Sequence, residues 1–280
     1  MQYDDRDLRK LQLLELRILK EIDRVCRELG ITYFLDSGSV LGALRHGGFI
    51  PWDDDIDLGM PRADYDRFVA EAPAFLGEEY VVSTPETNLH QAALFGKVWL
   101  RGTRFATEET IEAGFDQGIF VDLLPYDALS SDPATAAKQR RDCRFWQSVS
   151  YLSHAKSIVV PHKGALGAIE RAACGAAHLA ARGLYSPEKI VSRFNKAATC
   201  GNDPSLASDD LVVMAYATYE PYARSMMLPA STVTFEGCEF PAPADPEAFL
   251  RQLYGEWRKL PPVEARRNHA PVELDFGPYA

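Results

Sequence analysis

The sequence lacks any long hydrophobic run. No window of about 18 apolar residues occurs in its 280 residues, which excludes a transmembrane helix. The first residues, Met1 to Asp7, are charged rather than apolar, so no secretory signal is visible. We therefore expect a cytoplasmic protein without a transmembrane segment, either free or bound peripherally at the inner face of the membrane.

Cysteines are few, and several common motifs are missing. The five cysteines are odd in number and form no C-x-x-C pair, so we expect reduced thiols rather than a zinc or redox site. The chain also has no G-x-G-x-x-G, no G-x-x-x-x-G-K-[ST] and no H-E-x-x-H. These absences argue against a dinucleotide fingerprint, a phosphate-binding P-loop and a zinc-protease helix.

Basic residues are outnumbered. The 40 Asp and Glu against 30 Lys and Arg give a formal net charge of −10. Because binding to a nucleic-acid backbone demands a basic surface, we expect no nucleic-acid partner. The 46% hydrophobic and 25% charged residues are ordinary globular usage. A chain of this length forms one large domain or two small ones.

Apolar periodicity predicts mixed α and β elements in the first 130 residues. Apolar residues at three- and four-residue steps over residues 8–29 predict an amphipathic helix that ends at Gly30. The other expected elements are a strand at 31–35, a helix at 40–46 capped by Ser39, a strand at 56–60, a helix at 62–72 opened by Pro61, and strands at 80–83, 94–100 and 119–124.

Composition changes after residue 130. From Pro133 to about Cys200, Ala, Arg and Lys replace β-branched residues, which predicts three helices broken near 161–164 and 186–187. Beyond them, three prolines predict a loop before a short helix at 249–254. We expect a single α+β domain, with a core in 1–130, a helical subdomain in 131–205 and a C-terminal loop and helix region in 206–280.

An acidic run follows the short helix. Asp53, Asp54, Asp55 and Asp57 put four carboxylates within five residues, with Ile56 among them. If the strand begins near Asp55, alternation sends Asp55 and Asp57 to one face and Ile56 toward the core. Neighbouring carboxylates repel each other unless a cation lies between them. The run therefore predicts a Mg²⁺ or Mn²⁺ site; the alternative is an acidic surface turn.

These residues also form a family pattern. The Gly38-Ser39 turn, the short helix and Asp55-Ile56-Asp57 resemble the signature of the nucleotidyltransferase (DNA polymerase β-like) superfamily. More specifically, the twenty-residue stretch 38–57 resembles the LicD family of phosphocholine transferases, whose relatives include the fukutin-related ribitol-phosphate transferases. Further blocks fit at 96–103, at 119–127 and at 253–262 with His269.

The sequence departs from the family pattern at two places. Ser39 stands where the family usually has Thr, which keeps the hydroxyl. Residues Glu256, Trp257 and Arg258 stand where the family usually has Asp-Tyr-Met, so the C-terminal block gives no guide to specificity.

The resemblance implies a fold and a reaction. The fold is a nucleotidyltransferase-type mixed-sheet core with helices and a mainly helical insert. The reaction moves a phosphocholine-like phospho-alcohol from a CDP-activated donor such as CDP-choline to a hydroxyl of a cell-surface glycan, free or lipid-linked, as in modification of lipopolysaccharide or teichoic acid, and releases CMP. Two Mg²⁺ or Mn²⁺ ions are implied. The alternatives are a nucleotidyltransferase that releases pyrophosphate and a non-catalytic nucleotide- or sugar-binding homologue.

Three carboxylates are the expected catalytic and metal-binding residues. The resemblance assigns Asp55 and Asp57 to the metal. Asp122 lies in an apolar strand where a lone acid needs a reason, so it is the third carboxylate, as a metal ligand or as the general base. Its alternative is a solvent-facing place on an edge strand. His269, a lone histidine near the C-terminus, favours a structural role.

Five further residues are candidates for binding the nucleotide or its phosphates. Gly38 and Ser39 at a helix start offer N–H groups and a hydroxyl to phosphate, although Ser39 can also act simply as the helix cap. Lys97 neutralises a donor phosphate or is a surface lysine. Arg45 belongs to the motif and binds phosphate or braces the metal loop. Trp52 stacks on the base or, as an aromatic beside Pro and Ile more often does, closes the core.

Overall fold

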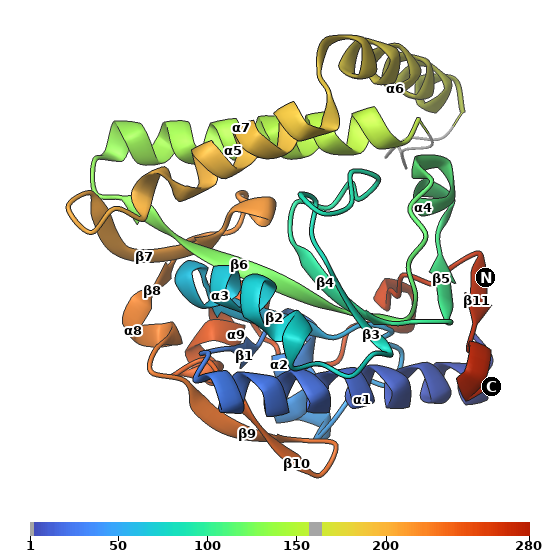
Figure 1. Cartoon of the computed structure of the whole chain (residues 1–280), viewed down its shortest axis with the longest axis vertical. Helices are drawn as coiled ribbons and strands as arrows, with labels where there is room; N and C mark the ends of the chain where they lie inside the picture. The colour runs from blue at the N-terminus through green and yellow to red at the C-terminus, as the bar shows by residue number, and fades with distance from the viewer. Residues whose placement is uncertain (1–2, 157–163) are drawn as a thin grey trace.

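A long helix opens the part of the chain that the computed structural model describes, residues 3–156 and 164–280 (Figure 1). This helix, α1 (Asp5–Leu29), buries the predicted apolar stripe. The carboxylate of Asp4 accepts a hydrogen bond from the Arg6 N–H at its start. Gly30 ends the helix in the left-handed conformation, with φ 63°, which a residue with a side chain rarely adopts. The predicted amphipathic helix is confirmed.

Seven of the described strands form one mixed sheet. Its order is β1-β2-β6-β4-β3, while β7 pairs with β6 and β8 with β7. β2 runs parallel to β6, and the other pairs are antiparallel. The predicted α+β architecture with a mixed sheet is confirmed. The strands of this sheet are β1 (Phe34–Leu35), β2 (Asp57–Pro61), β3 (Tyr80–Ser83), β4 (Gly96–Leu100), β6 (Phe120–Ser130), β7 (Ala207–Val213) and β8 (Tyr222–Ala223).

Strand β6 is the centre of the sheet. All 11 of its residues are buried, and it runs on past the strand predicted for 119–124. It extends further because β2 and β4 flank its first part, whereas β7 pairs with its second part. Asp122, in the first part, therefore lies on a central strand and not on an edge.

Helices cover the sheet. Figure 1 shows α1 along the bottom and the layer of α5 and α7 near the top, with β6 running between them. The three helices predicted between 133 and 200 are confirmed, with the second break at Ser186. Residues 161–163 of the first predicted break lie outside the described residues. The other helices are α2 (Ser37–His46), α3 (Arg62–Glu71), α4 (Glu108–Ala113), α5 (Pro133–His154), α6 (Gly164–Leu184), α7 (Pro187–Ala198), α8 (Arg224–Met227) and α9 (Pro246–Tyr254), with 3₁₀ turns at 72–74, 199–201, 214–216, 263–265 and 277–279.

The C-terminal part differs from the prediction. The predicted helix is confirmed as α9, but strands occupy much of the region expected to be loop. β7 and β8 join the main sheet, β9 (Ser231–Phe235) and β10 (Cys238–Ala242) form a hairpin, and β11 (Glu273–Asp275) pairs with β5 (Arg104–Ala106). The prediction of loop was wrong because these strands are short, half-exposed or interrupted by Pro241, and so lack an apolar run.

Two features of the described residues bear on the expected compartment. None of the helices in residues 3–156 and 164–280 is long and apolar enough to cross a membrane. The five cysteines all fall within these ranges, and each is unpaired.

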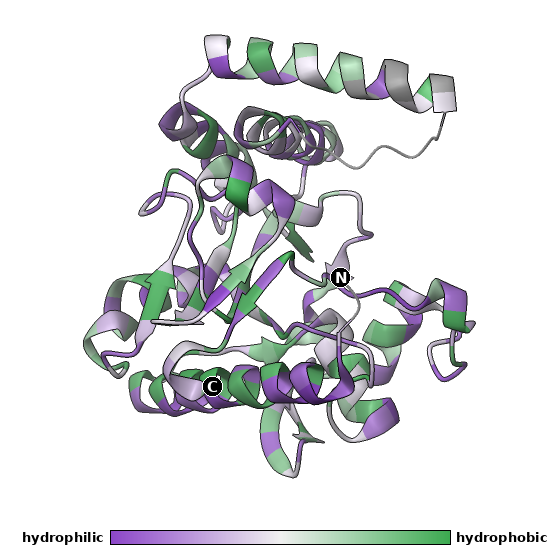
Figure 2. Cartoon of the chain, turned by 90° about the vertical axis from the view of Figure 1, so that its right-hand side faces the viewer, coloured by the Kyte–Doolittle hydropathy of each residue, from purple (hydrophilic) through white to green (hydrophobic). Residues whose placement is uncertain are grey.

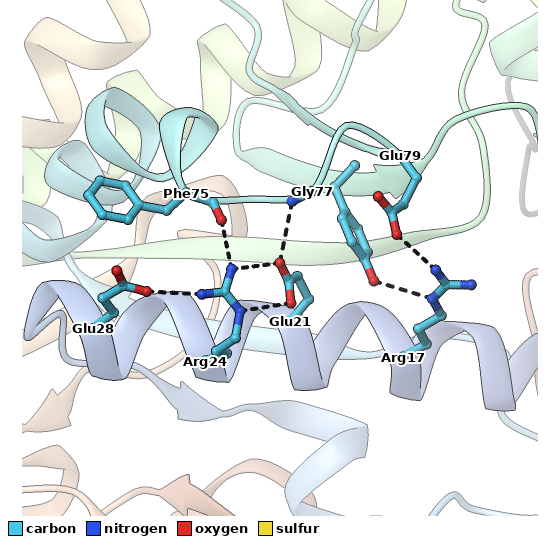
Figure 3. Close-up of polar contacts among 8 residues, drawn as sticks. Arg17, Glu21, Arg24, Glu28, Phe75, Gly77 and Glu79 are labelled. Carbon is cyan, nitrogen blue, oxygen red and sulfur yellow. Dashed lines mark hydrogen bonds and ion pairs between the residues drawn. The ribbon is translucent and has the colours of Figure 1, made fainter.

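Polar contacts fix α1 against the turn before β3 (Figure 3). Arg24 donates to the carbonyl of Phe75 at 2.6 Å. The carboxylate of Glu21 accepts from the main-chain N–H of Gly77 at 3.3 Å. These contacts hold the C-terminal half of α1 against the turn before β3. The N-terminal half of the helix lies next to the acidic run.

Candidate active site

Three adjacent strands place three predicted site residues in one row. In the sheet register, Asp57 of β2 is opposite Asp122 of β6, and Asp122 is opposite Lys97 of β4. Paired residues on neighbouring strands point to the same face of a sheet. The Lys97 ammonium donates to Asp122 Oδ1 at 2.5 Å. The row therefore unites residues from three separate segments of the chain.

Burial decides between two alternatives that the sequence left open. Lys97 is 7% exposed and Asp122 is 8% exposed. The ammonium of Lys97 also lies 3.6 Å from the centre of the Phe120 ring. Lys97 is therefore not a surface lysine, and Asp122 is not a solvent-facing residue of an edge strand.

The acidic run supplies the rest of the negative charge. The strand begins at Asp57, two residues later than expected, yet Asp55 still lies on the same cavity as Asp57. Asp53 also lines this cavity, whereas Ile56 is completely buried. The expected separation of the acids from Ile56 is confirmed, and a solvated acidic turn is excluded.

Burial and mutual repulsion raise the pKa values of these acids. Burial, with repulsion from Asp55 and Asp122, raises the pKa of Asp57 well above its ordinary value. Burial raises the pKa of Asp55 to about 6 and that of Asp53 to about 8, with nearby carboxylates adding to both shifts. Burial also raises the pKa of Asp122, although Lys97 opposes the shift. The ionised cluster is therefore costly unless a cation shares the site.

Asp54 has a different task from its neighbours. It is completely buried, and it accepts a hydrogen bond from the Tyr3 hydroxyl at 2.7 Å. It also accepts from the main-chain N–H of His269, at 2.8 Å to one carboxylate oxygen and 3.0 Å to the other. Asp54 thus joins the N-terminal segment and the C-terminal segment to the acidic run.

His269 lies at the site as well as anchoring its segment. Its Nδ1 is 3.4 Å from an oxygen of Asp54 and 3.4 Å from an oxygen of Asp55. The hydrogen bond to Asp54 raises the pKa of His269 to about 9, with further support from Asp55. The imidazole is thus charged at neutral pH and lines the cavity. The sequence favoured a structural role. The main-chain hydrogen bond to Asp54 is such a role, and the residue lines the cavity in addition.

Two sets of side chains could hold a metal. Asp54, Asp55 and His269 bring one potential ligand atom each within 4.8 Å of one another. However, both oxygens of Asp54 already accept from the main-chain N–H of His269, and one of them also accepts from the Tyr3 hydroxyl. Asp55 and Asp57, beside Asp122, keep carboxylate oxygens directed to the cavity, and such hard oxygen donors suit Mg²⁺ or Mn²⁺.

The cavity is acidic on one side and aromatic on the other. Its volume is about 660 Å³, within the ordinary range for small-molecule sites. Its polar lining includes Ser37, Gly38, Asp53, Asp55, Asp57, Gln91, Lys97, Asp122 and His269. Its aromatic lining consists of Phe95, Phe105, Phe115, Phe120, Tyr151, Tyr216, Tyr219 and Tyr254.

The start of α2 faces this cavity, but its cap is not the one predicted. Asp36 caps the helix by accepting from the Ser37 N–H, and Ser39 lies inside the first turn. The Ser39 hydroxyl instead accepts from the main-chain N–H of Asp57 at 3.0 Å, which fixes the start of β2. Gly38 lines the cavity. Ser39 therefore positions a site residue.

Arg45 and Trp52 lie within the described residues but do not line the cavity. Arg45 donates to the carbonyl of Trp257 at 2.8 Å. The guanidinium of Arg266 lies 4.3 Å from the centre of the Trp52 ring. Both residues thus connect the motif to the C-terminal segment, and the cavity gives no support to a nucleotide contact by either.

Three residues at or near the site were not predicted from the sequence: Glu15, Tyr216 and Tyr219. Glu15 is completely buried, and neither of its carboxylate oxygens has a hydrogen-bond partner among the residues that the structure describes. Burial, with repulsion from Asp55, raises its pKa well above the ordinary value. A signal was present, because Glu15 follows Leu11 by four residues on the apolar stripe of α1. Tyr216 and Tyr219, which stack at 15°, give no comparable signal.

Comparison with known proteins agrees with this arrangement. The family described as "LicD/FKTN/FKRP, nucleotidyltransferase domain" matches residues 30–149, which include the row and the acidic run. Lipopolysaccharide cholinephosphotransferase LicD of Haemophilus influenzae is 30% identical over 275 residues, which cover 94% of this chain and 95% of that protein. Ribitol 5-phosphate transferase FKRP of Homo sapiens is 51% identical over 49 residues, or 16% of this chain and 10% of its own. Since the similarity to the Haemophilus influenzae protein runs through nearly the whole of both chains, this protein belongs to the LicD family.

Proposed function

We propose that this protein transfers a phosphocholine-like phospho-alcohol from a CDP-activated donor to a hydroxyl of a cell-surface glycan and releases CMP. The observation that carries the proposal is the row of Lys97, Asp122 and Asp57 beside Asp55 in one cavity. Such a site can accept a pyrophosphate if cations balance the buried acids. We also infer that the core has the nucleotidyltransferase fold.

The relatives support this class of reaction. The Haemophilus influenzae relative is named for cholinephosphate transfer on lipopolysaccharide, and the human relative is named for ribitol 5-phosphate transfer. Both names describe the movement of a phosphorylated alcohol. We infer the same class here, with a glycan or lipid-linked glycan as the acceptor.

Asp55, Asp57 and Asp122 would hold Mg²⁺ or Mn²⁺, and two ions fit the proposal. Three clustered carboxylates with raised pKa values offer the hard oxygen donors that suit divalent cations. When bound, such ions supply positive charge for the pyrophosphate oxygens and for the leaving phosphate.

The residues of the chain supply positioning and proton transfer. Gly38, in the first turn of α2, lines the cavity, and its main-chain N–H together with the helix dipole would favour a phosphate oxygen there. Lys97 adds a positive charge from the opposite side of Asp122. The acceptor hydroxyl forms a new bond to the transferred phosphorus, and the bond from that phosphorus to the CMP oxygen breaks. A carboxylate takes the hydroxyl proton.

A product assay tests the proposal. The enzyme is incubated with CDP-choline, CDP-ribitol or CTP and an acceptor glycan, with Mg²⁺ or with a chelator. We expect Mg²⁺-dependent CMP release from a CDP-alcohol. Asp55→Asn should lower the rate by at least about a hundredfold, whereas Asp209→Asn, on the exposed face of β7, should leave it unchanged. Pyrophosphate release from CTP would favour nucleotidyl transfer instead, and CDP-choline binding without turnover would favour a non-catalytic homologue.

Mn²⁺ affinity separates two roles for Asp122. If Asp122 is a ligand, Asp122→Asn weakens Mn²⁺ binding together with turnover. If Asp122 is the general base, the variant binds Mn²⁺ as tightly as wild type and loses turnover alone. Titration followed by electron paramagnetic resonance measures the binding directly.

A further inference from the structure

The outer face of α6 is apolar and has no covering element among the described residues. The inner face packs against α5, where the carbonyl of Leu152 accepts from His178 Nδ1 at 2.7 Å. On the outer face, Leu179 is 72% exposed and Leu184 is 67% exposed. Figures 1 and 2 both show α6 as the outermost element on this side, beyond α5 and α7. The exposed positions of α6 further include Leu166, Ala172, Ala173, Ala176 and Ala180.

The same part of the chain is basic, although the protein as a whole is acidic. Residues 131–205 contain 11 Lys and Arg against 5 Asp and Glu, a formal charge of +6, and the rest of the chain carries −16. The described basic side chains that are exposed on the three helices and just after α5 are Lys138, Arg141, Arg144, Lys156, Arg182, Lys189, Arg193 and Lys196. The region that carries the exposed leucines of α6 is therefore net positive.

This surface is connected to the cavity through α5. Tyr151 and Ala155, in the last turn of α5 and just after it, line the cavity. Leu152, next to Tyr151, receives the hydrogen bond from His178 of α6. One turn of α5 thus contributes both to the cavity wall and to the contact with α6.

We propose that the outer face of α6, with the basic side chains of α5 and α7, docks on an anionic lipid bilayer. Exposed leucines insert into the boundary between headgroups and acyl chains, and lysines and arginines attract anionic headgroups. A second copy of the chain is a poorer occupant, because it would bring together two regions that are each net positive. Docking would present the cavity to an acceptor linked to lipid.

Vesicle flotation tests the docking surface. The full chain is mixed with vesicles of phosphatidylcholine alone or of phosphatidylcholine with phosphatidylglycerol. We expect binding to the anionic vesicles that weakens in about 0.5 M salt, because surface attraction is screened. The double variant Leu179→Glu/Leu184→Glu should lower the partition coefficient about tenfold or more, since it removes apolar anchors and adds negative charge.

A matched double variant controls for added charge elsewhere. Leu13→Glu/Leu260→Glu changes two leucines of similar exposure, 48% and 50%, outside α6. It should bind vesicles as wild type does. Equal binding by the α6 variant, or equal binding to neutral and anionic vesicles, would overturn the proposal. So would a dimer in light scattering that only the α6 variant loses. The flotation assay contains neither donor nor acceptor, so its result is independent of the proposed function.

Discussion

At the scale of single residues, the carboxylates of the site repel one another and so oppose the stability of the fold. Asp55 and Asp57 lie half-buried at one cavity, and Asp122 adds a third, buried carboxylate on the next strand. Only part of this charge is balanced within the described residues, by Lys97 on Asp122 and by His269 near Asp55. Such a cluster lowers the free energy of unfolding, and under the proposed function we expect a bound divalent ion to reverse the effect.

Asp57→Asn should therefore stabilise the metal-free protein. Removing this one carboxylate relieves the repulsion from Asp55 and Asp122, and we expect Tm to rise by about 2 °C or more. Mn²⁺ should raise the Tm of wild type but not that of the variant. Differential scanning calorimetry with and without Mn²⁺ measures both effects, with Asp209→Asn as the control. A lower Tm for Asp57→Asn in a chelator would contradict this account.

At the scale of elements, the loop from α2 to β2 depends on a close backbone approach. A Cβ placed on Gly42 would lie 2.4 Å from the carbonyl oxygen of Gly48 and 3.3 Å from the N of Ile50. The loop thus returns directly over α2 and delivers the acidic run to β2. This contact gives a physical reason for one glycine of the stretch 38–57.

Gly42→Ala should disturb this loop. The added methyl group forces the backbone of Gly48 away, and we expect a loss of about 1–3 kcal/mol in the free energy of unfolding with lower turnover. Urea denaturation measures the loss. Gly175→Ala in α6 is the matched control, because a Cβ there meets nothing within 4 Å and alanine favours a helix. Equal stability of both variants would show that the loop does not need its close approach.

At the scale of the whole molecule, Asp54 holds the two ends of the chain at the site. Tyr3 and His269 both donate to this one buried carboxylate, from opposite ends of the chain. Because His269 also lines the cavity, the C-terminal segment belongs to the site and does not merely follow the core.

Asp54→Ala should loosen both ends. The Tyr3 hydroxyl and the His269 N–H lose their acceptor, and we expect a loss of about 2–4 kcal/mol with faster proteolysis after residue 260. His269→Ala keeps the main-chain N–H, so it should retain most of the stability while lowering turnover. Urea denaturation and limited proteolysis separate the two variants. Asp54→Ala with wild-type stability and proteolysis would show that these hydrogen bonds do not hold the ends.

The sequence by itself determined the elements whose signals are local. Apolar spacing and end residues located α1, β3 and α9 closely, because a helix stripe or a strand run is written in consecutive residues. The stretch 38–57 likewise carried the family resemblance, and with it Asp55 and Asp57. The local pattern failed at the start of α2, since Asp36 rather than the predicted Ser39 caps this helix.

Only the tertiary structure decided which distant residues meet. The register that lines up Lys97, Asp122 and Asp57 depends on pairing between residues 25 and 65 positions apart, as the residue numbers show. Residues far apart in the sequence also meet where β7 pairs with β6 and where His269 lies beside Asp55. Such contacts are fixed by the joint packing of the whole core, which no local run of residues encodes.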